Sequence, residues 1–427
     1  MEYLNIAGLI IDLFAIAGGG GSSNGSSTGG GSSFGGGSSY GDYSSGGGGG
    51  SGYGQFDAIA GIIMLVVLVL MMSIFAWILF SGFKAVKKKR ANMAQKLKSA
   101  SINDKLWDET ALKQHVADTF VRYQKDWSEF NIKSMQTYMT AGYFQHASMM
   151  MEALVQADRT NIVDKIKVNR TEIDSFSNPD GTDSDTFIAS VDADLRDTLI
   201  TTSSGQQLYT KEYPSYLEHY KFKRHNNDWL LDGINTSTAS LGMLQNSVQD
   251  FAKANNLFFS LDWGYLLLPA RGQLFGNGKF GTSDINNHCI GKYNDVLIQL
   301  YTYIPEPDYK SETGYVIAQT SVPKNYGEIS IRRKGVLSVL SKVKHLTKLE
   351  TEWADFNKKY EVLASDGELA TSFELLNPKY MEQLEAVEFD VNIQVVDNII
   401  YLYTSDLSAD YNIMLGLLKS AFKEMRI

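Results

Sequence analysis

The sequence contains a single cysteine, Cys289, among 427 residues. One cysteine excludes an internal disulfide and a zinc site built on cysteine pairs, and it suits a reducing compartment. We expect Cys289 to be a small buried side chain rather than a reactive thiol. The formal charge of −9 argues against a general nucleic-acid binder, so no nucleic-acid partner is expected.

No lysine or arginine precedes Lys84, and residues from Ala58 to Phe80 carry no charge at all. At about 1.5 Å per residue, such a run is long enough to cross a bilayer core of roughly 30 Å. Because basic residues occur only after the run, the positive-inside rule places the C-terminal part in the cytoplasm. The sequence therefore predicts a single-pass protein of the cell membrane, with a transmembrane helix over residues 56–83, the N-terminus outside and the soluble domains cytoplasmic.

A basic, helix-favouring segment follows the apolar run, and we expect it to form a juxtamembrane helix over residues 84–107. Its charges would lie within a Debye length of the cytoplasmic leaflet, where each is worth about 1 kcal/mol against anionic lipid. The residues predicted to contact anionic head groups are Lys84, Lys87, Lys88, Lys89 and Arg90.

The N-terminal part allows two interpretations. Residues 1–17 are apolar but too short to span a membrane alone. Ala15-Ile16-Ala17 resembles a signal-peptidase site, whereas Glu2 stands where a signal peptide has a basic residue, so a cleaved signal and an uncleaved interfacial segment both stay open. Residues 18–55 are mostly Gly and Ser and are predicted to be a flexible tether.

Residues 108–235 have the pattern of an α+β domain, with helices first and strands afterwards. Apolar residues recur every three or four positions from Leu112 to Trp127, and a second amphipathic helix is predicted over residues 132–154. The period then changes to two over residues 187–195, and two more strands are predicted over 216–224 and 229–234.

Residues 236–427 are predicted to form a second α+β domain. It begins with a helix that carries Leu241, Leu244, Val248 and Phe251, and it ends with a helix over residues 408–423. The strands predicted between these helices cover residues 264–268, 296–304, 315–320, 391–395 and 399–403.

Motifs for catalysis or for metal binding are missing or lack their context. The sequence has no Gly-x-Ser-x-Gly and no phosphate loop. Gly276 to Gly281 matches a bare dinucleotide fingerprint, but no helix is predicted after it, so we interpret it as a turn. The six histidines are scattered, His219 and His225 are expected to be exposed, and a run of aspartates is expected on a solvated strand and loop: Asp183, Asp185, Asp192, Asp194 and Asp197. We therefore predict no catalytic residue, no metal and no cofactor.

Four segments within residues 108–235 resemble the Tim44-like family: Phe120 to Trp127, Asn161 to Val168, Glu218 to Arg224 and Trp229 to Leu231. Tyr220 stands where that family usually has Trp, and Asn131 where it usually has Asp. The resemblance implies a cone-shaped α+β fold of the nuclear-transport-factor-2 (NTF2) type. The plan of apolar segment, Gly/Ser tether, membrane span and domain is also similar to that of bacterial members.

A cone of this kind leaves a concavity between the sheet and its helices. Five aromatic residues are candidates to line it, although ordinary core packing would explain them equally well: Tyr123, Trp127, Tyr138, Phe144 and Tyr220. Farther along the chain, residues 280–293 and 300–303 resemble a domain of unknown function from bacterial membrane-anchored proteins, which implies no chemistry.

Tim44-like relatives are associated with membrane surfaces and with protein translocation or ribosome attachment. The resemblance therefore implies a membrane-anchored adaptor or scaffold that binds a partner polypeptide, without enzymatic activity, in protein translocation or membrane-protein assembly. The alternative is a tethered small-molecule binder or enzyme of the NTF2 type, which would need an acid or histidine deep in the cone, with His146 and Asp192 as candidates. The partner's identity and the oligomeric state stay open.

Overall fold

The computed structural model describes residues 71–73, 77, 84, 87–178, 184–235, 246–264, 266–267, 284–305, 314–322, 325–334, 346–365 and 375–424. These residues form a mixed α+β structure, as the sequence predicts. They contain no helix that is both long enough and apolar enough to cross a membrane. Most of the apolar run predicted to span the membrane over residues 56–83, together with the segments 1–17 and 18–55, lies outside the described residues.

The described part of the chain divides into two compact units at Glu109 and Thr110. In the first unit, residues 87–103 form one continuous helix, and the short 3-10 helix η1 (Lys105–Trp107) follows it. Asp104 begins η1 by accepting a hydrogen bond from the Leu106 amide over 3.0 Å. A helical segment after the apolar run is thus confirmed for the described residues.

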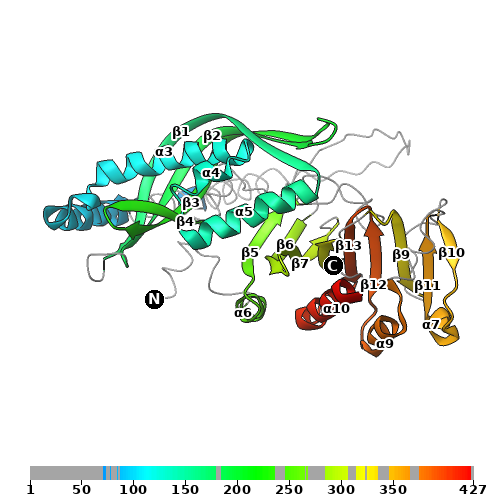
Figure 1. Cartoon of the computed structure of the whole chain (residues 1–427). Coiled ribbons are helices and arrows are strands. Elements are labelled where there is room, and N and C mark those ends of the chain that lie inside the picture. Colours follow the sequence, from blue (N-terminus) through cyan, green and yellow to red (C-terminus); the bar gives the residue numbers. More distant parts are fainter. Residues whose placement is uncertain are drawn as a thin grey trace, which may run out of the picture. The chain divides into compact units, whose positions relative to one another are not determined.

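The second unit begins with three helices and a four-stranded antiparallel sheet (Figure 1). The sheet order is β1-β2-β3-β4, so each strand pairs with its neighbour in sequence. The elements are α3 (Glu109–Ser128), α4 (Ile132–Met135), α5 (Ala141–Gln156), β1 (Arg159–Ser177), β2 (Thr186–Thr201), β3 (Gln207–His225) and β4 (Asp228–Asn235).

Helix α3 packs its apolar stripe against one face of this sheet. Leu112, Val116 and Phe120 are buried, and the Phe120 ring meets the Tyr220 ring edge-on at 5.7 Å. Strand β2 presents its alternate residues Phe187 to Leu195 to the same core, which confirms the predicted period of two. The apolar periodicity of this region was therefore a reliable guide to its core face.

The second predicted helix, over residues 132–154, is interrupted in the structure. The chain leaves the helix after Met135 because residues 138–140 run beside β4: the Leu231 amide donates to the Tyr138 carbonyl over 2.8 Å, and the Thr140 amide donates to the Leu231 carbonyl over 2.9 Å. Thr140 then caps α5, because its hydroxyl accepts from the Tyr143 amide over 3.4 Å.

The rest of the second unit is a nine-stranded antiparallel sheet in the order β10-β11-β9-β12-β13-β8-β7-β6-β5. Its strands are β5 (Phe258–Gly264), β6 (Asp284–Tyr293), β7 (Val296–Ile304), β8 (Tyr315–Ser321), β9 (Glu328–Arg333), β10 (Thr347–Leu349), β11 (Tyr360–Ala364), β12 (Asn392–Val396) and β13 (Ile399–Thr404). Its helices are α6 (Asn246–Ala254), α7 (Ala354–Lys359), α9 (Pro378–Ala386) and α10 (Tyr411–Glu424). The strand predicted over residues 264–268 is wrong, since β5 ends at Gly264 and the buried Leu266 and Leu267 lie in a turn.

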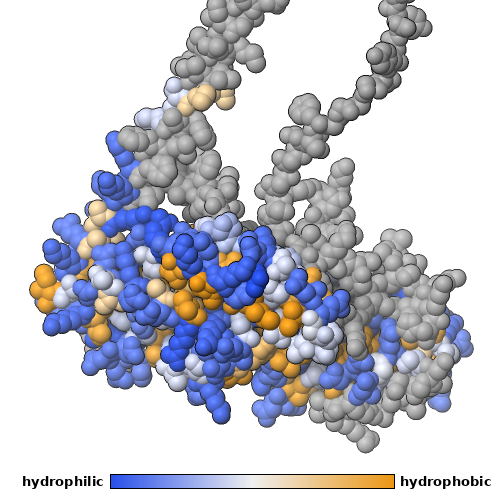
Figure 2. Space-filling model, turned by 90° about the horizontal axis from the view of Figure 1, so that it is seen from above, coloured by the Kyte–Doolittle hydropathy of each residue, from blue (hydrophilic) through white to orange (hydrophobic). Residues whose placement is uncertain are grey.

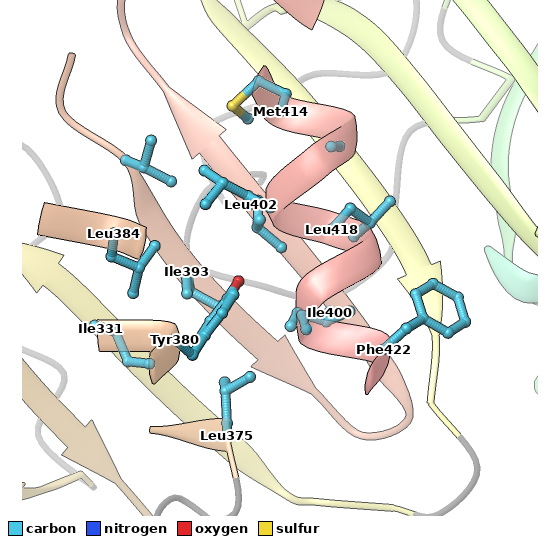
Figure 3. Packing of buried hydrophobic residues seen from close by; sticks show 14 of the residues in the cluster. Ile331, Leu375, Tyr380, Leu384, Ile393, Ile400, Leu402, Met414, Leu418 and Phe422 are labelled. Atoms are coloured by element: carbon cyan, nitrogen blue, oxygen red, sulfur yellow. The ribbon is translucent and has the colours of Figure 1, made fainter. Parts of the chain in front are cut away.

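Helices α9 and α10 cover one face of the nine-stranded sheet. Figure 3 shows α10, with Met414, Leu418 and Phe422, lying over β13, which carries Ile400 and Leu402, and all five side chains are at most 2 % exposed. The same core takes in Tyr380 and Leu384 of α9 with Ile331 and Ile393 of the sheet. Burial of this many large apolar side chains supplies the main driving force for this half of the unit.

Candidate functional site

The most unusual group on the inner face of the four-stranded sheet is a buried carboxylate, Glu218. It lies on β3 and is 8 % exposed, with Tyr220 and Phe222 following it on the same face at alternate positions. Across the sheet it is paired with Val191 of β2. An acidic residue at an apolar position of a strand is rare because burying its charge is costly.

Two tyrosines donate hydrogen bonds to Glu218. The Tyr216 hydroxyl donates to Oε1 over 2.7 Å, and the Tyr220 hydroxyl donates to Oε2 over 3.0 Å. Gln124 of α3 makes only long contacts, with its Nε2 at 3.5 Å from both Glu218 Oε2 and the Tyr220 hydroxyl. Each carboxylate oxygen therefore accepts one short hydrogen bond from a tyrosine. The hydrogen bond from Gln124 of α3 is long and therefore weak.

Burial raises the pKa of Glu218, and the hydrogen bonds from Tyr216 and Tyr220 and the charge of His219 oppose that shift. Burial likewise holds the pKa values of Tyr216 and Tyr220 well above their usual value, so both hydroxyls keep their protons and stay donors. No lysine or arginine among the described residues forms an ion pair with Glu218.

Three of the five aromatic residues predicted to line a concavity form one cluster with this carboxylate: Tyr123, Trp127 and Tyr220. Tyr220 contacts Glu218 directly, and the Tyr123 ring lies edge-on to the Tyr220 ring at 6.5 Å. Tyr123 in turn stacks on Trp127 at 5.9 Å. Tyr123, Trp127 and Tyr220 are at most 9 % exposed, whereas Phe144 on α5 is half-buried.

Tyr138, the remaining member of that predicted set, binds a cation of the same chain. The guanidinium carbon of Arg122 lies 4.3 Å from the centre of the Tyr138 ring, and its Nε lies 3.7 Å from Asp126 Oδ2. Arg122 thus sits between an aromatic face and a buried carboxylate, an arrangement that favours a positive charge.

A second run of hydrogen bonds leads from Trp127 toward the sheet. Trp127 Nε1 donates to Asn161 Oδ1 over 3.0 Å, and the side-chain Nδ2 of Asn161 donates to Asp197 Oδ1. Asp197 is one of the charges that raise the pKa of Tyr216. Hydrogen bonds therefore link Trp127 to Asp197, and the charge of Asp197 acts on Tyr216, which in turn donates to Glu218.

The two groups that the sequence offered as deep acid or base lie elsewhere. Asp192 points to the opposite face from Val191, where it accepts a hydrogen bond from Ser215 over 2.9 Å. His146 lies on α5, stacks on Phe258 of β5 at 5.1 Å and contacts the Ser260 hydroxyl over 3.2 Å. Burial lowers the pKa of His146 to about 4. Glu218, the buried acid on β3, was missed.

The aspartate run was predicted to be solvated, and this is wrong for Asp185, which is fully buried against Arg224 over 3.1 Å. Asp192 and Asp194 are ion-paired with Arg170 and Lys167 at 3.8 Å each. Asp183 lies outside the described residues. Within the described ranges no group of three or more His, Cys, Asp or Glu residues is arranged to hold a metal ion.

Other sequence candidates have plain structural roles. Cys289 is buried, as predicted, and burial raises the pKa of its thiol to about 12. The prediction that His219 is exposed is wrong. Its ring is partly buried, and its Nδ1 lies 3.0 Å from Asp174 Oδ2. His225 is exposed at the end of β3, as predicted. The Gly276–Gly281 pattern lies outside the described residues.

Helix α5 touches both sheets of the second unit. On one side it contacts β1 and β4, and on the other β6 and β7. Gln156 of α5 accepts a hydrogen bond from Gln299 Nε2 over 3.3 Å and contacts the Ser321 hydroxyl over 3.4 Å. Gln299 also meets the fully buried His288 over 3.0 Å, and burial lowers the pKa of His288 to about 4. One helix thus links the Glu218 region to the nine-stranded sheet.

The residues predicted to contact lipid all have exposed side chains: Lys84, Lys87, Lys88, Lys89 and Arg90. Lys96 and Lys98 add two further exposed cations on the same helix, and no acidic residue occurs from Lys84 to Lys98. The face of the second unit that Figure 2 shows has no such uniform segment, because hydrophilic and hydrophobic residues are interspersed on it. The chain therefore presents seven cations within a segment that contains no acidic residue.

No family model matches the chain, and no curated protein matches it. Among solved structures, the mycobacterial trehalose monomycolate transport factor A, TtfA, is similar at 9% identity, over 42% of this chain and 91% of that chain, with a TM-score of 0.30. The intermembrane space region of the chloroplast protein ARC6 is similar at 12% identity, over 29% of this chain and 94% of that chain, with a TM-score of 0.23. Similarity at this level carries no conclusion about fold or function.

Proposed function

We propose that this chain is a single-pass, membrane-anchored adaptor without enzymatic activity. In this proposal the apolar segment over residues 56–83 spans the membrane, and the helix that follows lies against anionic lipid. The lobe built on the four-stranded sheet, of Tim44-like and NTF2-like type, then binds a partner polypeptide on the cytoplasmic side. Such an adaptor would act in protein translocation or membrane-protein assembly.

The observation that carries the proposal is the run of seven exposed cations from Lys84 to Lys98 directly after the apolar run. Cations clustered beside a membrane span are attracted to anionic head groups, and each contributes about 1 kcal/mol near the surface. The described residues of the apolar run support the same interpretation, because Met71 and Trp77 are 67% and 70% exposed although both are large and apolar.

The lipid contact is tested with the full chain in nanodiscs, using an environment-sensitive NBD dye on Asn92→Cys in a Cys289→Ser background. Asn92 is exposed on the basic helix, so the dye reports on its surroundings. We expect quenching by nitroxide-labelled lipid to be stronger in discs with anionic lipid than in zwitterionic discs. Replacing Lys84, Lys87, Lys88, Lys89 and Arg90 by Gln should remove that difference.

A matched variant removes five exposed lysines elsewhere: Lys125, Lys133, Lys223, Lys253 and Lys379. It lowers the net charge by the same amount, so it should retain the lipid dependence if position rather than total charge is responsible. Equal quenching in both kinds of disc for the unmodified chain would contradict the lipid contact.

A second function, a tethered small-molecule binder or enzyme of the NTF2 type, is favoured by one specific observation. Glu218 is a buried carboxyl with a raised pKa that accepts hydrogen bonds from Tyr216 and Tyr220, and such groups are frequent at functional sites. Native mass spectrometry of the chain released from its own membrane distinguishes the two functions. A metabolite retained by the unmodified chain and lost in Glu218→Gln would favour the second.

A further inference from the structure

Helix α5 meets the nine-stranded sheet through polar side chains, and we call its contact with β5, β6, β7 and β8 the α5 joint. Gln299 Nε2 donates to Gln156 Oε1 over 3.3 Å, and Gln156 Nε2 donates to the Ser321 hydroxyl over 3.4 Å. Both are long hydrogen bonds between neutral groups, which contribute little to stability. The ion pair of Glu152 with Lys292 over 3.0 Å is 40% and 43% exposed, so solvent screens it.

Each of the two lobes that α5 connects has an apolar core of its own. Among the described residues, the core of the nine-stranded sheet and the hydrophobic side chains packed against it all come from Val248 onward. In the other lobe Phe187 and Phe222 are buried and stack at 4.8 Å. The face of the nine-stranded sheet that α5 meets carries the buried cross-strand partners Gln299 and Gln319 instead. Separation at the α5 joint would therefore break neither core.

Two histidines lie in the α5 joint, one from each side. His146 of α5 stacks on Phe258 of β5 at 5.1 Å, and its Nε2 lies 3.2 Å from the Ser260 hydroxyl. His288 of β6 is fully buried, and Ser260 is its cross-strand partner on β5. The two rings thus approach the same residue, and a charge on His146 acts against a charge on His288.

The hydrogen bonds of His288 suit the neutral ring only. Because Gln299 uses its Nε2 to donate to Gln156, its Oε1 accepts in the 3.0 Å contact with His288, so the proton of the neutral ring is on Nε2. Among the described residues, the buried Nδ1 of His288 has no hydrogen-bond partner. A second proton would place a charged N–H there without an acceptor, which is costly in a buried site.

The titratable groups around the two histidines do not compensate a positive charge. Glu152 of α5 is already paired with Lys292 of β6. Tyr143 lies edge-on to the ring of His146 at 6.4 Å, and Tyr301 lies 6.0 Å from the ring of His288. Burial raises the pKa of both tyrosines, so they remain neutral. Among the described side chains, neither histidine is paired with a carboxylate.

We propose that the α5 joint is an acid-sensitive device, in which proton uptake by His146 and His288 separates the two lobes while each lobe keeps its own core. Burial lowers the pKa of both rings to about 4, whereas an exposed histidine has a pKa of about 6.5. The joint is therefore closed above pH 6.5, and the open form takes up protons first as pH falls below 6.5. Between pH 7.5 and pH 5.0 each histidine can raise the ratio of open to closed form by up to about 30-fold. This inference does not depend on the adaptor function.

The test is double electron–electron resonance between two nitroxide labels on the full chain in zwitterionic nanodiscs, frozen from pH 7.5 and from pH 5.0. In a Cys289→Ser background, Lys223→Cys labels β3 and Lys379→Cys labels α9, and both positions are exposed. We expect one narrow distance distribution at pH 7.5 and an additional, longer and broader population at pH 5.0. Two control pairs lie within one lobe, Lys133→Cys with Lys223→Cys and Lys253→Cys with Lys379→Cys, and their distances should not change.

Two histidine variants assign the response to the joint. His146→Phe keeps the stacking on Phe258, and His288→Gln keeps a donor for Gln299. The double variant should retain its pH 7.5 distribution at pH 5.0, each single variant should show a smaller second population, and the exposed control His225→Gln should behave like the unmodified chain. If the control pairs show that the double variant does not fold, the single variants decide. An unchanged distribution at pH 5.0, a second population undiminished in the histidine variants, or equal broadening of the control pairs would overturn the proposal.

Discussion

The Tyr220 hydroxyl donates a hydrogen bond to Glu218 Oε2 over 3.0 Å at the inner face of the four-stranded sheet. Both side chains are buried, at 0 % and 8 % exposure, and both come from the same face of β3. The tyrosine lies two residues after the glutamate on the same strand, and its hydroxyl therefore supplies a hydrogen bond to the buried carboxylate. This pair links the stability of the lobe to the protonation of one carboxyl group.

Glu218→Gln is expected to stabilise the lobe at neutral pH. Burial raises the pKa of Glu218, so between its unfolded and folded pKa values the folded state binds more protons than the unfolded state, and stability falls as pH rises. Removing the charge should raise the free energy of unfolding at pH 7 by on the order of 1 kcal/mol. Thermal unfolding at pH 7 and pH 4 measures this, and the gain should shrink at pH 4. The exposed control Glu382→Gln should change little at either pH, and a loss of stability at pH 7 in Glu218→Gln would contradict the assignment.

His146→Phe is expected to reduce the sensitivity of the second unit to acid. Burial lowers the pKa of His146 to about 4, so as pH falls below 6.5 the unfolded state takes up a proton first and stability is lost. Between pH 6.5 and about pH 4, His146 lowers the free energy of unfolding by up to about 1.4 kcal/mol for each pH unit. Urea unfolding at pH 6.5 and pH 5 should show a shallower dependence in the variant, whose ring still stacks on Phe258. The exposed His225→Gln should retain the dependence of the unmodified chain, and an unchanged slope in His146→Phe would refute the prediction.

Trp127→Phe tests the polar network beside Glu218. The change keeps an aromatic ring against Tyr123 but removes the donor that satisfies Asn161 Oδ1 over 3.0 Å. An unsatisfied buried acceptor costs about 1 to 3 kcal/mol, and we expect a loss of stability of that size in urea unfolding. Val121→Ala, on the exposed side of the same helix, should cost much less, and equal losses in the two variants would show that the network adds nothing.

Leu418→Ala tests the core between α10 and the nine-stranded sheet. Leu418 is fully buried in the cluster that includes Leu402 and Ile400, so its truncation leaves a cavity (Figure 3). We expect a loss of about 2 to 5 kcal/mol in the free energy of unfolding. Ile413→Ala, on the same helix but 40 % exposed, should lose less than about 1 kcal/mol. A small loss for Leu418→Ala would mean that α10 packs loosely.

Local patterns predicted those elements whose core face repeats regularly. The apolar stripe from Leu112 to Trp127 predicted α3, the alternation from Phe187 to Leu195 predicted β2, and the apolar runs over residues 391–395 and 399–403 predicted the paired strands β12 and β13. The pattern that predicts each of these elements involves only residues that are close in sequence, so one sequence is enough to detect it. The α+β class followed from their order.

What the sequence did not predict depends on partners far along the chain. Strand β1 runs from Arg159 to Ser177 with three irregularities in register and many charged residues, so it lacks the alternation of a half-buried strand. Strand β9 lies between β11 and β12, which both follow it in sequence. Glu218 was overlooked because a glutamate is normally exposed, although the alternation with Tyr220 and Phe222 placed it on the buried face.

The central claim, a membrane-anchored chain with its described units in the cytoplasm, is tested most directly by labelling single cysteines with a membrane-impermeable maleimide in intact cells. In a Cys289→Ser background, Ser45→Cys reports on the predicted tether and Ser99→Cys on the exposed side of the basic helix. We expect Ser45→Cys to be labelled in intact cells and Ser99→Cys only after permeabilisation. Labelling of Ser99→Cys in intact cells would contradict the predicted orientation and, with it, the adaptor function.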